Sequence, residues 1–238
     1  MDAGALLARL TERPEEAAIL LDVDGTLAPI VVRPEDARVP DETRAELARL
    51  ARRYALVACI SGRPAAGAAR VVGVEGVCYL GEHGLELEPD AEAWAERLRA
   101  FAETVEWPAE EGKRLSLSFH FRASADPVSA EAYLRAVAQK ATAEGLRPRW
   151  GRKVLEIRPP LDADKGTAVR RLLEQARLRR ALYAGDDSTD LDAFRGLDGL
   201  EVAVRVAVAS DEAPPELALA ADVVVPSPDA IAVLLRRL

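Results

Sequence analysis

Three short apolar segments that each end in acidic or small polar residues constrain the fold of this chain most strongly. They are AAILLDVDG at 17–25, YALVACISGR at 54–63 and RALYAGDDSTD at 180–190. None alternates between polar and apolar residues, and helix-like sequence flanks each of them. Short continuous apolar runs joined by helices are typical of buried parallel strands with helical crossovers. The pattern therefore predicts an α/β fold with a parallel sheet.

The expected helices and the end of the chain fit this fold. Helices are predicted at 41–53 and 165–179, where apolar residues recur along one face. EVAVRVAV at 201–208 and ADVVVP at 221–226 have the composition of further strands, and a last helix is expected near 229–237.

The middle of the chain has a different pattern. RLSLSFHFR at 114–122 alternates with a period of two, which predicts a strand with one buried and one exposed face. Helices are expected at 92–104 and 129–143, and short strands within 145–159. We therefore expect a small α+β layer at 89–161, inserted into a core formed by 1–88 and 162–238.

Composition limits the classes of function. The formal net charge is −8, which argues against a nucleic-acid partner or an anionic membrane surface. No apolar run has the length of a membrane span, and the charged N-terminus does not resemble a signal peptide. Cys59 and Cys78 lack metal-ligand spacing, so we interpret them as buried thiols of a cytoplasmic protein.

Functional groups follow all three predicted strands. Ligands of open parallel sheets bind outside the carboxyl ends of the strands. The residues at these ends are Asp22, Asp24, Ser61, Gly62, Arg63, Asp186, Asp187 and Asp190. If the strands are neighbours, five carboxylates converge and repel one another unless a cation binds. Carboxylate and carbonyl oxygens suit Mg²⁺, so we expect a magnesium site.

The same stretches resemble a known superfamily. DVDGTL, SGR, DADKG and GDDSTD are similar, in order, to the four motifs of the haloacid dehalogenase superfamily of phosphoryl-transfer enzymes. The resemblance implies a Rossmann-like core with a cap domain inserted between the second and third motifs. It also implies that Asp22 is a nucleophile that forms an aspartyl-phosphate, and that Asp24 acts as general acid and then base.

The resemblance implies roles for the other motif residues as well. Lys165 would supply positive charge beside Asp22. The phosphoryl group would be bound by Ser61, Gly62 and Arg63. The Mg²⁺ ligands would be Asp22, Asp186, Asp187 and the carbonyl oxygen of Asp24.

Within this superfamily the inserted segment resembles the trehalose-6-phosphate phosphatase family. GEHG at 81–84, EGKRLSLSFHFR at 111–122 and GRKVLEIRP at 151–159 carry the likeness, with Phe121 in place of the usual tyrosine. The resemblance implies hydrolysis of a small-molecule sugar phosphate, trehalose 6-phosphate, to trehalose and phosphate, with the sugar hydroxyls bound by Glu111, Lys113 and Glu156.

Other interpretations of these residues stay open at this stage. Asp186 or Asp190 could cap a helix that starts near residue 188, and Ser61-Gly62 could be a turn. Lys113 could lie in a solvated pair with Glu111, and Glu156 could face outward. The roles of Asp190, His83 and His120 are undecided. The alternatives to trehalose 6-phosphate hydrolysis are a phosphatase of sucrose phosphate or a glycosylglycerate phosphate, and a non-catalytic sugar-phosphate sensor. Protein partners and oligomeric state are not predicted.

Overall fold

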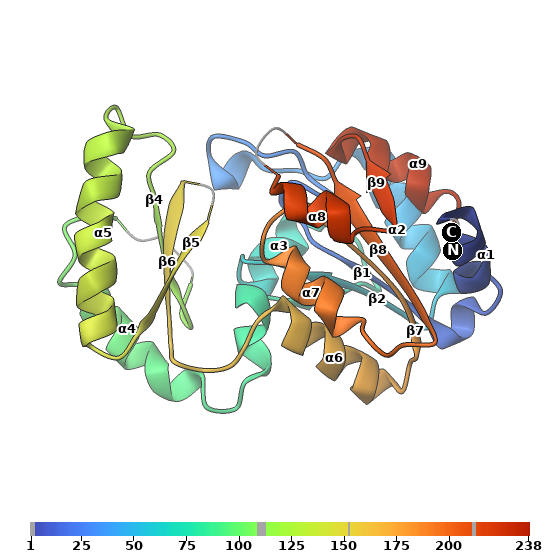
Figure 1. Ribbon diagram of the computed structural model, residues 1–238, viewed down its shortest axis with the longest axis horizontal. Helices are drawn as coiled ribbons and strands as arrows, with labels where there is room; N and C mark the ends of the chain where they lie inside the picture. Colours follow the sequence, from blue (N-terminus) through green and yellow to red (C-terminus); the bar gives the residue numbers. More distant parts are fainter. Residues whose placement is uncertain (1–2, 109–112, 152, 211–212) are drawn as a thin grey trace. The chain divides into compact units, whose positions relative to one another are not determined.

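The computed structural model describes residues 3–108, 113–151, 153–210 and 213–238, which form two compact units (Figure 1). The first unit contains the chain up to Gly84 and Ala163–Leu238. The second, which we call the inserted unit, is Leu85–Asp162. From the sequence alone we expected the insertion at 89–161.

The first unit is built on a six-stranded parallel sheet, which confirms the predicted α/β fold. Its strand order is β3-β2-β1-β7-β8-β9. The strands are β1 (Ala17–Leu21), β2 (Leu56–Ile60), β3 (Cys78–Leu80), β7 (Arg180–Gly185), β8 (Val202–Val208) and β9 (Val223–Val225). All of them except the short β3 are expected from the apolar runs.

Helices cover both faces of this sheet. They are α1 (Ala3–Thr11), α2 (Asp41–Arg53), α3 (Ala65–Val72), α6 (Lys165–Ala176), α7 (Asp190–Gly196), α8 (Pro215–Ala220) and α9 (Ile231–Leu235). Short 3₁₀ turns lie at Pro14–Glu16, Pro34–Asp36, Glu82–Leu87 and Pro228–Ala230. Every residue of β1 is buried, and its alternate side chains contribute to a core with residues of α1, α2, α3 and α9.

The position of β1 determines where functional groups meet. In the register of the sheet, Leu21 lies opposite Cys59 of β2 on one side and Ala184 of β7 on the other. The strand order runs outward from β1 to β2 and β3, and in the other direction from β7 to β8 and β9. The carboxyl ends of β1 and β7 therefore form a topological switch point, where ligands of open α/β sheets bind.

Two local features fix the start of α6 and its approach to α7. Asp164 caps α6, because its carboxylate accepts from the backbone N–H of Thr167 while the Thr167 hydroxyl accepts from the Asp164 N–H. Gly166 lies so close to α7 that a Cβ there would be 2.3 Å from the carbonyl oxygen of Asp192. Only glycine allows this approach, which places Lys165 beside the start of α7.

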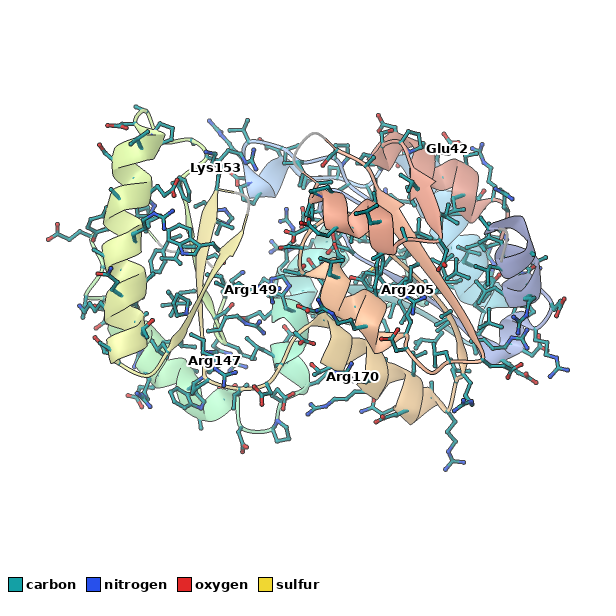
Figure 2. All side chains as sticks on the ribbon, viewed as in Figure 1. Glu42, Arg147, Arg149, Lys153, Arg170 and Arg205 are labelled. Carbon is teal, nitrogen blue, oxygen red and sulfur yellow. The ribbon has the colours of Figure 1, made fainter. Side chains whose placement is uncertain are left out.

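An arginine on β8 connects this strand to the end of α7. Arg205 of β8, labelled in Figure 2, donates to the Phe194 carbonyl of α7 at 3.3 Å and to the Asp198 carboxylate at 2.7 Å. These bonds hold the end of α7 against β8. Among the described residues, every helix is too short or too polar to cross a lipid bilayer.

The inserted unit contains an antiparallel sheet of order β4-β6-β5, formed by Leu117–His120, Val154–Arg158 and Arg147–Gly151, respectively. Helices α4 (Ala95–Ala102) and α5 (Pro127–Ala143) pack on one face around Phe119 and Leu155. The helix expected at 92–104 is a 3₁₀ turn at Glu92–Trp94 followed by the shorter α4.

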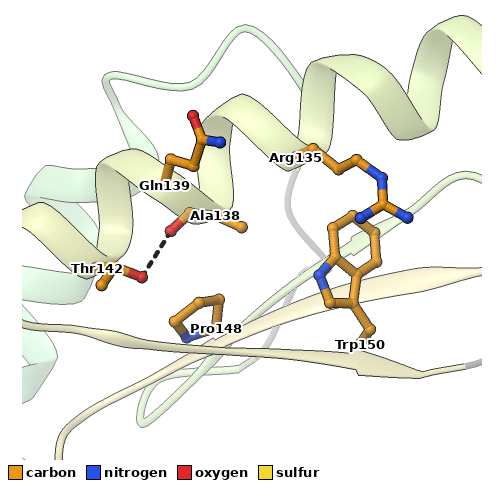
Figure 3. A pocket seen from close by; sticks show the side chains of 6 residues that line it. All are labelled: Arg135, Ala138, Gln139, Thr142, Pro148 and Trp150. Carbon is orange, nitrogen blue, oxygen red and sulfur yellow. Dashed lines mark hydrogen bonds between the residues drawn. The ribbon is translucent and has the colours of Figure 1, made fainter.

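A cavity of ≈ 250 Å³ lies between α5 and β5 (Figure 3). The guanidinium of Arg135 lies 5.3 Å from the centroid of the Trp150 ring on one side of it. The other lining residues are Ala138, Gln139, Thr142 and Pro148. The lining contains no carboxylate, so this cavity is unrelated to the acidic strand ends.

Candidate active site

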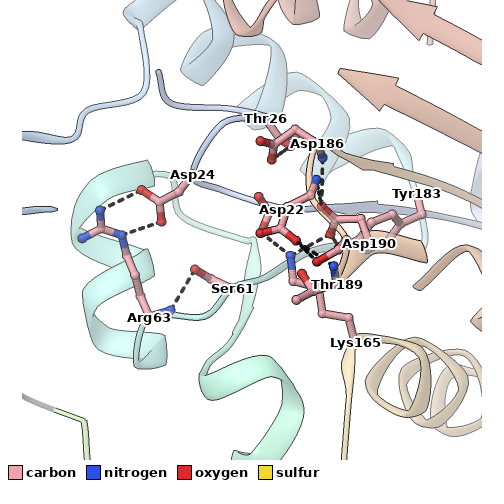
Figure 4. A network of polar contacts seen from close by, with 12 residues as sticks. Asp22, Asp24, Thr26, Ser61, Arg63, Lys165, Tyr183, Asp186, Thr189 and Asp190 are labelled. Carbon is pink, nitrogen blue, oxygen red and sulfur yellow. Dashed lines mark hydrogen bonds and ion pairs between the residues drawn. The ribbon is translucent and has the colours of Figure 1, made fainter. Parts of the chain in front are cut away.

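The carboxyl end of β1 presents a buried ion pair (Figure 4). Asp22 follows β1 directly, and its N–H donates to the Ala184 carbonyl of β7 at 2.9 Å. Lys165, the first residue of α6, donates from Nζ to Asp22 Oδ1 at 2.6 Å and to Asp190 Oδ1 at 2.7 Å. The side chains of all three are at most 7% exposed. Residues from three distant parts of the chain therefore meet at one ammonium group.

Asp190 is saturated with hydrogen bonds. Its Oδ1 accepts from Lys165 and, at 2.7 Å, from the hydroxyl of Tyr183, while its Oδ2 accepts from the backbone N–H groups of Asp186 and Asp187 at 2.8 and 2.9 Å. A carboxylate has about four lone-pair positions, and all of them are used here. Asp190 does not cap the helix that it begins; it holds together the start of α6 and the loop after β7.

Asp186 lies across the cluster from Lys165. Its Oδ1 accepts from the Thr26 hydroxyl at 3.1 Å, and both residues are buried. Gly25 has φ +91°, and a Cβ on it would lie 2.1 Å from Asp186 Oδ2. The glycine of the DVDGTL stretch thus leaves room for the carboxylate that follows β7.

Electrostatics inside the cluster are unbalanced. Burial raises the pKa of Asp22 well above its ordinary value; Lys165 opposes this rise, and Asp190 and Asp186 add to it. Burial by itself would lower the pKa of Lys165, but Asp190 and Asp22 outweigh burial and raise it, so the amine stays protonated. Asp22 and Asp190 contact the ammonium of Lys165, and the carboxylate of Asp186 lies close to both of them, so negative charge exceeds positive charge within this group of four residues.

The donor set fits a hard divalent cation. Asp22, Asp186 and Asp190 each offer an oxygen within 4.8 Å of the others. Because the lone pairs of Asp190 are already occupied, the direct carboxylate ligands in this set would be Asp22 and Asp186. Asp187, also expected as a ligand, accepts through Oδ1 from the Thr189 N–H at 2.7 Å and the Ser188 hydroxyl at 2.9 Å.

Asp24 and Arg63 form a second pair. Arg63 donates from Nε and Nη2 to the two carboxylate oxygens of Asp24, each at 2.7 Å. The backbone N–H of Arg63 donates to the Ser61 hydroxyl at 3.1 Å. The side chain of Arg63 is 15% exposed and that of Asp24 is 31% exposed. Arg63 is therefore not a solvated surface residue, because it contacts the second acid of the β1 motif.

A left-handed stretch supports the loop after β2. Glu82, His83 and Gly84 have consecutive positive φ angles of 48°, 55° and 94°. The N–H of Glu82 donates to the Arg63 carbonyl and that of His83 to the Ser61 carbonyl, both at 2.9 Å. A Cβ on Gly62 would lie 2.7 Å from Nε2 of His83. His83 thus packs on the predicted phosphate-binding loop.

Two of the three predicted sugar-binding residues meet in the inserted unit. Lys113 donates from Nζ to the Ser118 hydroxyl at 2.6 Å and to Glu156 Oε1 at 3.4 Å. Ser118 and Glu156 lie opposite each other on β4 and β6. The side chains of Lys113 and Glu156 are only 5% and 8% exposed, so neither is an outward-facing surface residue. Glu111, the third, lies outside the described residues. His120 is exposed, and its backbone carbonyl accepts from the indole of Trp107.

Sequence reasoning missed the two hydroxyls in the cluster, from Thr26 and Tyr183. The hydroxyl of Thr26 donates to Asp186, a partner 160 residues away along the chain. Tyr183 is fully buried in a strand that is otherwise mostly aliphatic. A buried tyrosine hydroxyl needs a hydrogen-bond partner, and this requirement is the signal that could have found it.

Comparison with known proteins agrees with this geometry. The family model described as trehalose-phosphatase matches residues 20–110 and 96–222. A trehalose-phosphate phosphatase of Mycobacterium marinum is 35% identical over 213 residues, which cover 79% of this chain and 54% of that protein. An uncharacterized glycosyl hydrolase of Mycobacterium tuberculosis is 37% identical over 79% of this chain and 16% of its own length. The chain thus spans about half of the first relative and a small part of the second.

A solved structure shares the fold. The C-terminal domain of the Candida albicans trehalose-6-phosphate phosphatase superposes with a TM-score of 0.77 at 23% identity, over 98% of this chain and 95% of that domain. The likeness therefore extends over the first unit and the inserted unit.

Proposed function

Because the chain belongs to the trehalose-phosphatase family, we propose that it hydrolyses trehalose 6-phosphate to trehalose and phosphate in a Mg²⁺-dependent reaction. The observation that carries this proposal is the contact of Lys165 with Asp22 at the switch point of the sheet, with Asp186 beside them. A buried carboxylate held by an ammonium group is suited to attack on phosphorus in a dianionic ester.

Asp22 is the nucleophile in this proposal. Within the described residues its Oδ1 accepts from Lys165, whereas its Oδ2 has no hydrogen-bond partner and is the oxygen available for attack. The new bond joins this oxygen to phosphorus, and the bond from phosphorus to the sugar oxygen breaks. The ammonium of Lys165 offsets negative charge on Asp22 and on the phosphoryl group.

Asp24 is the general acid and then the general base in this proposal. It donates a proton to the departing sugar oxygen, and then accepts one from the water that attacks the phosphorus of the aspartyl-phosphate. That attack releases phosphate and restores Asp22. In the structure Asp24 is paired with Arg63, so the pair has to open before Asp24 can approach the leaving oxygen.

In this proposal the loop after β2 binds the phosphoryl group of the substrate. Ser61 offers a hydroxyl, and Gly62 allows close backbone approach because it lacks a Cβ. Arg63 is the bidentate donor of this loop, and a phosphoryl group presents the same pair of acceptor oxygens as the Asp24 carboxylate. We infer that, when the substrate binds, the Arg63 guanidinium releases the Asp24 carboxylate and donates to the phosphoryl group instead.

Mg²⁺ fits the excess negative charge of the cluster. It would be held by Asp22, Asp186 and the Asp24 carbonyl, with Asp187 as a ligand or an orienting group. When bound, it supplies charge neutralisation at the phosphoryl oxygens. Thr26 orients the Asp186 carboxylate through its hydroxyl.

The inserted unit is assigned to the sugar. Lys113 and Glu156 form a partly desolvated pair with Ser118, which offers both donors and acceptors to sugar hydroxyls. Glu111 is included in this group from the family resemblance. These side chains would distinguish a disaccharide phosphate from a simple hexose phosphate.

Phosphate release from a panel of substrates tests the proposal. The panel contains trehalose 6-phosphate, sucrose 6-phosphate, a glycosyl-3-phosphoglycerate and glucose 6-phosphate, each with Mg²⁺ and with EDTA. We expect fast release from trehalose 6-phosphate only, and only with Mg²⁺. Equal rates on glucose 6-phosphate would remove the substrate assignment, and binding without any release would favour a sensor.

A further inference from the structure

The hydroxyl of Tyr183 and the ammonium of Lys165 share one oxygen atom. Both donate to Asp190 Oδ1, each at 2.7 Å. Lys165 also donates to Asp22 Oδ1 at 2.6 Å, so its Nζ lies between two carboxylates. The position of Nζ between them depends on how strongly each carboxylate attracts it.

Tyr183 reduces the attraction from Asp190. An acceptor oxygen that already receives one short hydrogen bond holds a second donor less strongly than an oxygen that receives none. The Oδ2 of Asp190 cannot take over, because it accepts from the N–H groups of Asp186 and Asp187. We propose that Tyr183 is a positioning residue that acts through Asp190 to keep Lys165 on the nucleophile Asp22.

The tyrosine ring is anchored independently of its hydroxyl. Tyr183 is 0% exposed, and its ring packs edge-on against Phe194 with centroids 6.2 Å apart. Phenylalanine would keep this packing and lose only the hydrogen bond. The substitution Tyr183→Phe therefore isolates the contribution of the hydroxyl to the network.

Without the hydroxyl, Asp190 Oδ1 is left to Lys165 alone. We expect Nζ to move toward Asp190 and its distance to Asp22 Oδ1 to lengthen. This inference rests on the proposed function, in which Lys165 offsets charge on Asp22 during phosphoryl transfer. A misplacement of about 1 Å in an active site can cost about 100-fold in rate, so we expect a shift of a fraction of an ångström to lower kcat by roughly tenfold. KM should stay within about twofold, because Tyr183 contacts no proposed substrate-binding residue.

The chain offers a matched control in Tyr54. Its hydroxyl is also buried and donates to the Leu238 carbonyl at 3.1 Å. Tyr54 lies between α2 and β2, two residues before β2 begins, and so at the opposite end of the parallel strands from Asp22. Tyr54→Phe removes a comparable hydrogen bond and should leave kcat unchanged. A purely structural role of Tyr183 would make the two variants alike in activity.

The experiment measures kcat and KM for trehalose 6-phosphate with Mg²⁺ in the wild type, Tyr183→Phe and Tyr54→Phe, together with crystal structures of the wild type and Tyr183→Phe. The expected result is a roughly tenfold loss of kcat at unchanged KM in Tyr183→Phe alone, with a longer Lys165–Asp22 contact. Equal kcat in both variants, or an unchanged contact, would overturn the inference. If the wild type itself releases no phosphate, the proposed function fails, and the crystal distances still decide the position of Lys165.

Discussion

Arg63 holds both carboxylate oxygens of Asp24 in a bidentate pair, with two contacts of 2.7 Å. This pair joins the loop after β2 to the loop after β1, and it occupies the residue proposed to carry the proton. In the proposed mechanism, exchange of Asp24 for a phosphoryl group at Arg63 would couple substrate binding to the release of the proposed general acid.

We therefore expect the bidentate geometry of the Arg63 guanidinium to contribute to catalysis in addition to its positive charge. Arg63→Lys keeps the positive charge but cannot form two parallel hydrogen bonds, so we expect a kcat loss of roughly tenfold on trehalose 6-phosphate. Arg63→Gln, which also loses the charge, should additionally raise KM. Steady-state kinetics check both variants. A wild-type kcat in Arg63→Lys would show that the bidentate guanidinium of Arg63 is not required.

Asp190→Asn should be more damaging than its neighbouring control. The amide has a single acceptor oxygen with two lone pairs, so at least two of the four donors lose their acceptor inside the buried cluster. We expect the free energy of unfolding to fall by about 3 kcal/mol. Asp192→Asn changes an acid on α7 that pairs with exposed Arg195, and should cost less than about 1 kcal/mol. Urea denaturation measures both, and equal losses would contradict the central role of Asp190.

Gly25→Ala tests the close approach of Asp186. Gly25 and Gly199 have similar φ angles of +91° and +83°, but a Cβ on Gly199 meets nothing within 4 Å. Both alanine variants should lose about 1–2 kcal/mol from backbone strain. Only Gly25→Ala should displace Asp186 and lower phosphatase activity by roughly 100-fold. Circular dichroism and phosphate release separate these effects, and matching activities in the two variants would refute the steric explanation.

The thiol of Cys59 should be nearly inert in the folded protein. Burial raises the pKa of Cys59 and, to a smaller extent, that of Cys78. A raised pKa lowers the fraction of thiolate, the reactive form, at any given pH, so labelling should be slow at pH 8 and should accelerate as pH rises. Reaction with a chromogenic disulfide, with and without denaturant, measures this. Rapid labelling of Cys59 in native protein would contradict its burial.

Much of the first unit could be predicted because the sequence patterns that indicate its strands and helices are local. Continuous apolar runs indicate buried strands, and chain order places acids at their carboxyl ends. That β1 lies between β2 and β7 follows from tertiary packing, which local patterns do not encode. Once those strands are neighbours, the meeting of Asp22, Lys165 and Asp186 follows from the motifs.

The remaining features depend on contacts between distant residues. The hydroxyls of Thr26 and Tyr183 select partners that only the assembled sheet brings near. Positive φ angles are uncommon outside glycine, and although histidine adopts them more often than most residues, glutamate does not, so local propensity does not predict two in succession at Glu82 and His83. Arg63 could be assigned to phosphate from its motif, but its pairing with Asp24 depends on how the loops after β1 and β2 pack together.

The proposed mechanism is tested most directly by trapping the phosphoryl-enzyme. Protein that is turning over trehalose 6-phosphate with Mg²⁺ is quenched in acid and treated with borohydride, which reduces an aspartyl-phosphate to homoserine. Peptide mass spectrometry then locates the altered residue, with Asp22→Asn as the control. We predict homoserine at position 22 in the wild type and none in the variant. Phosphate release without any modification at Asp22, or modification of a different acid such as Asp186, would contradict the assignment of the nucleophile.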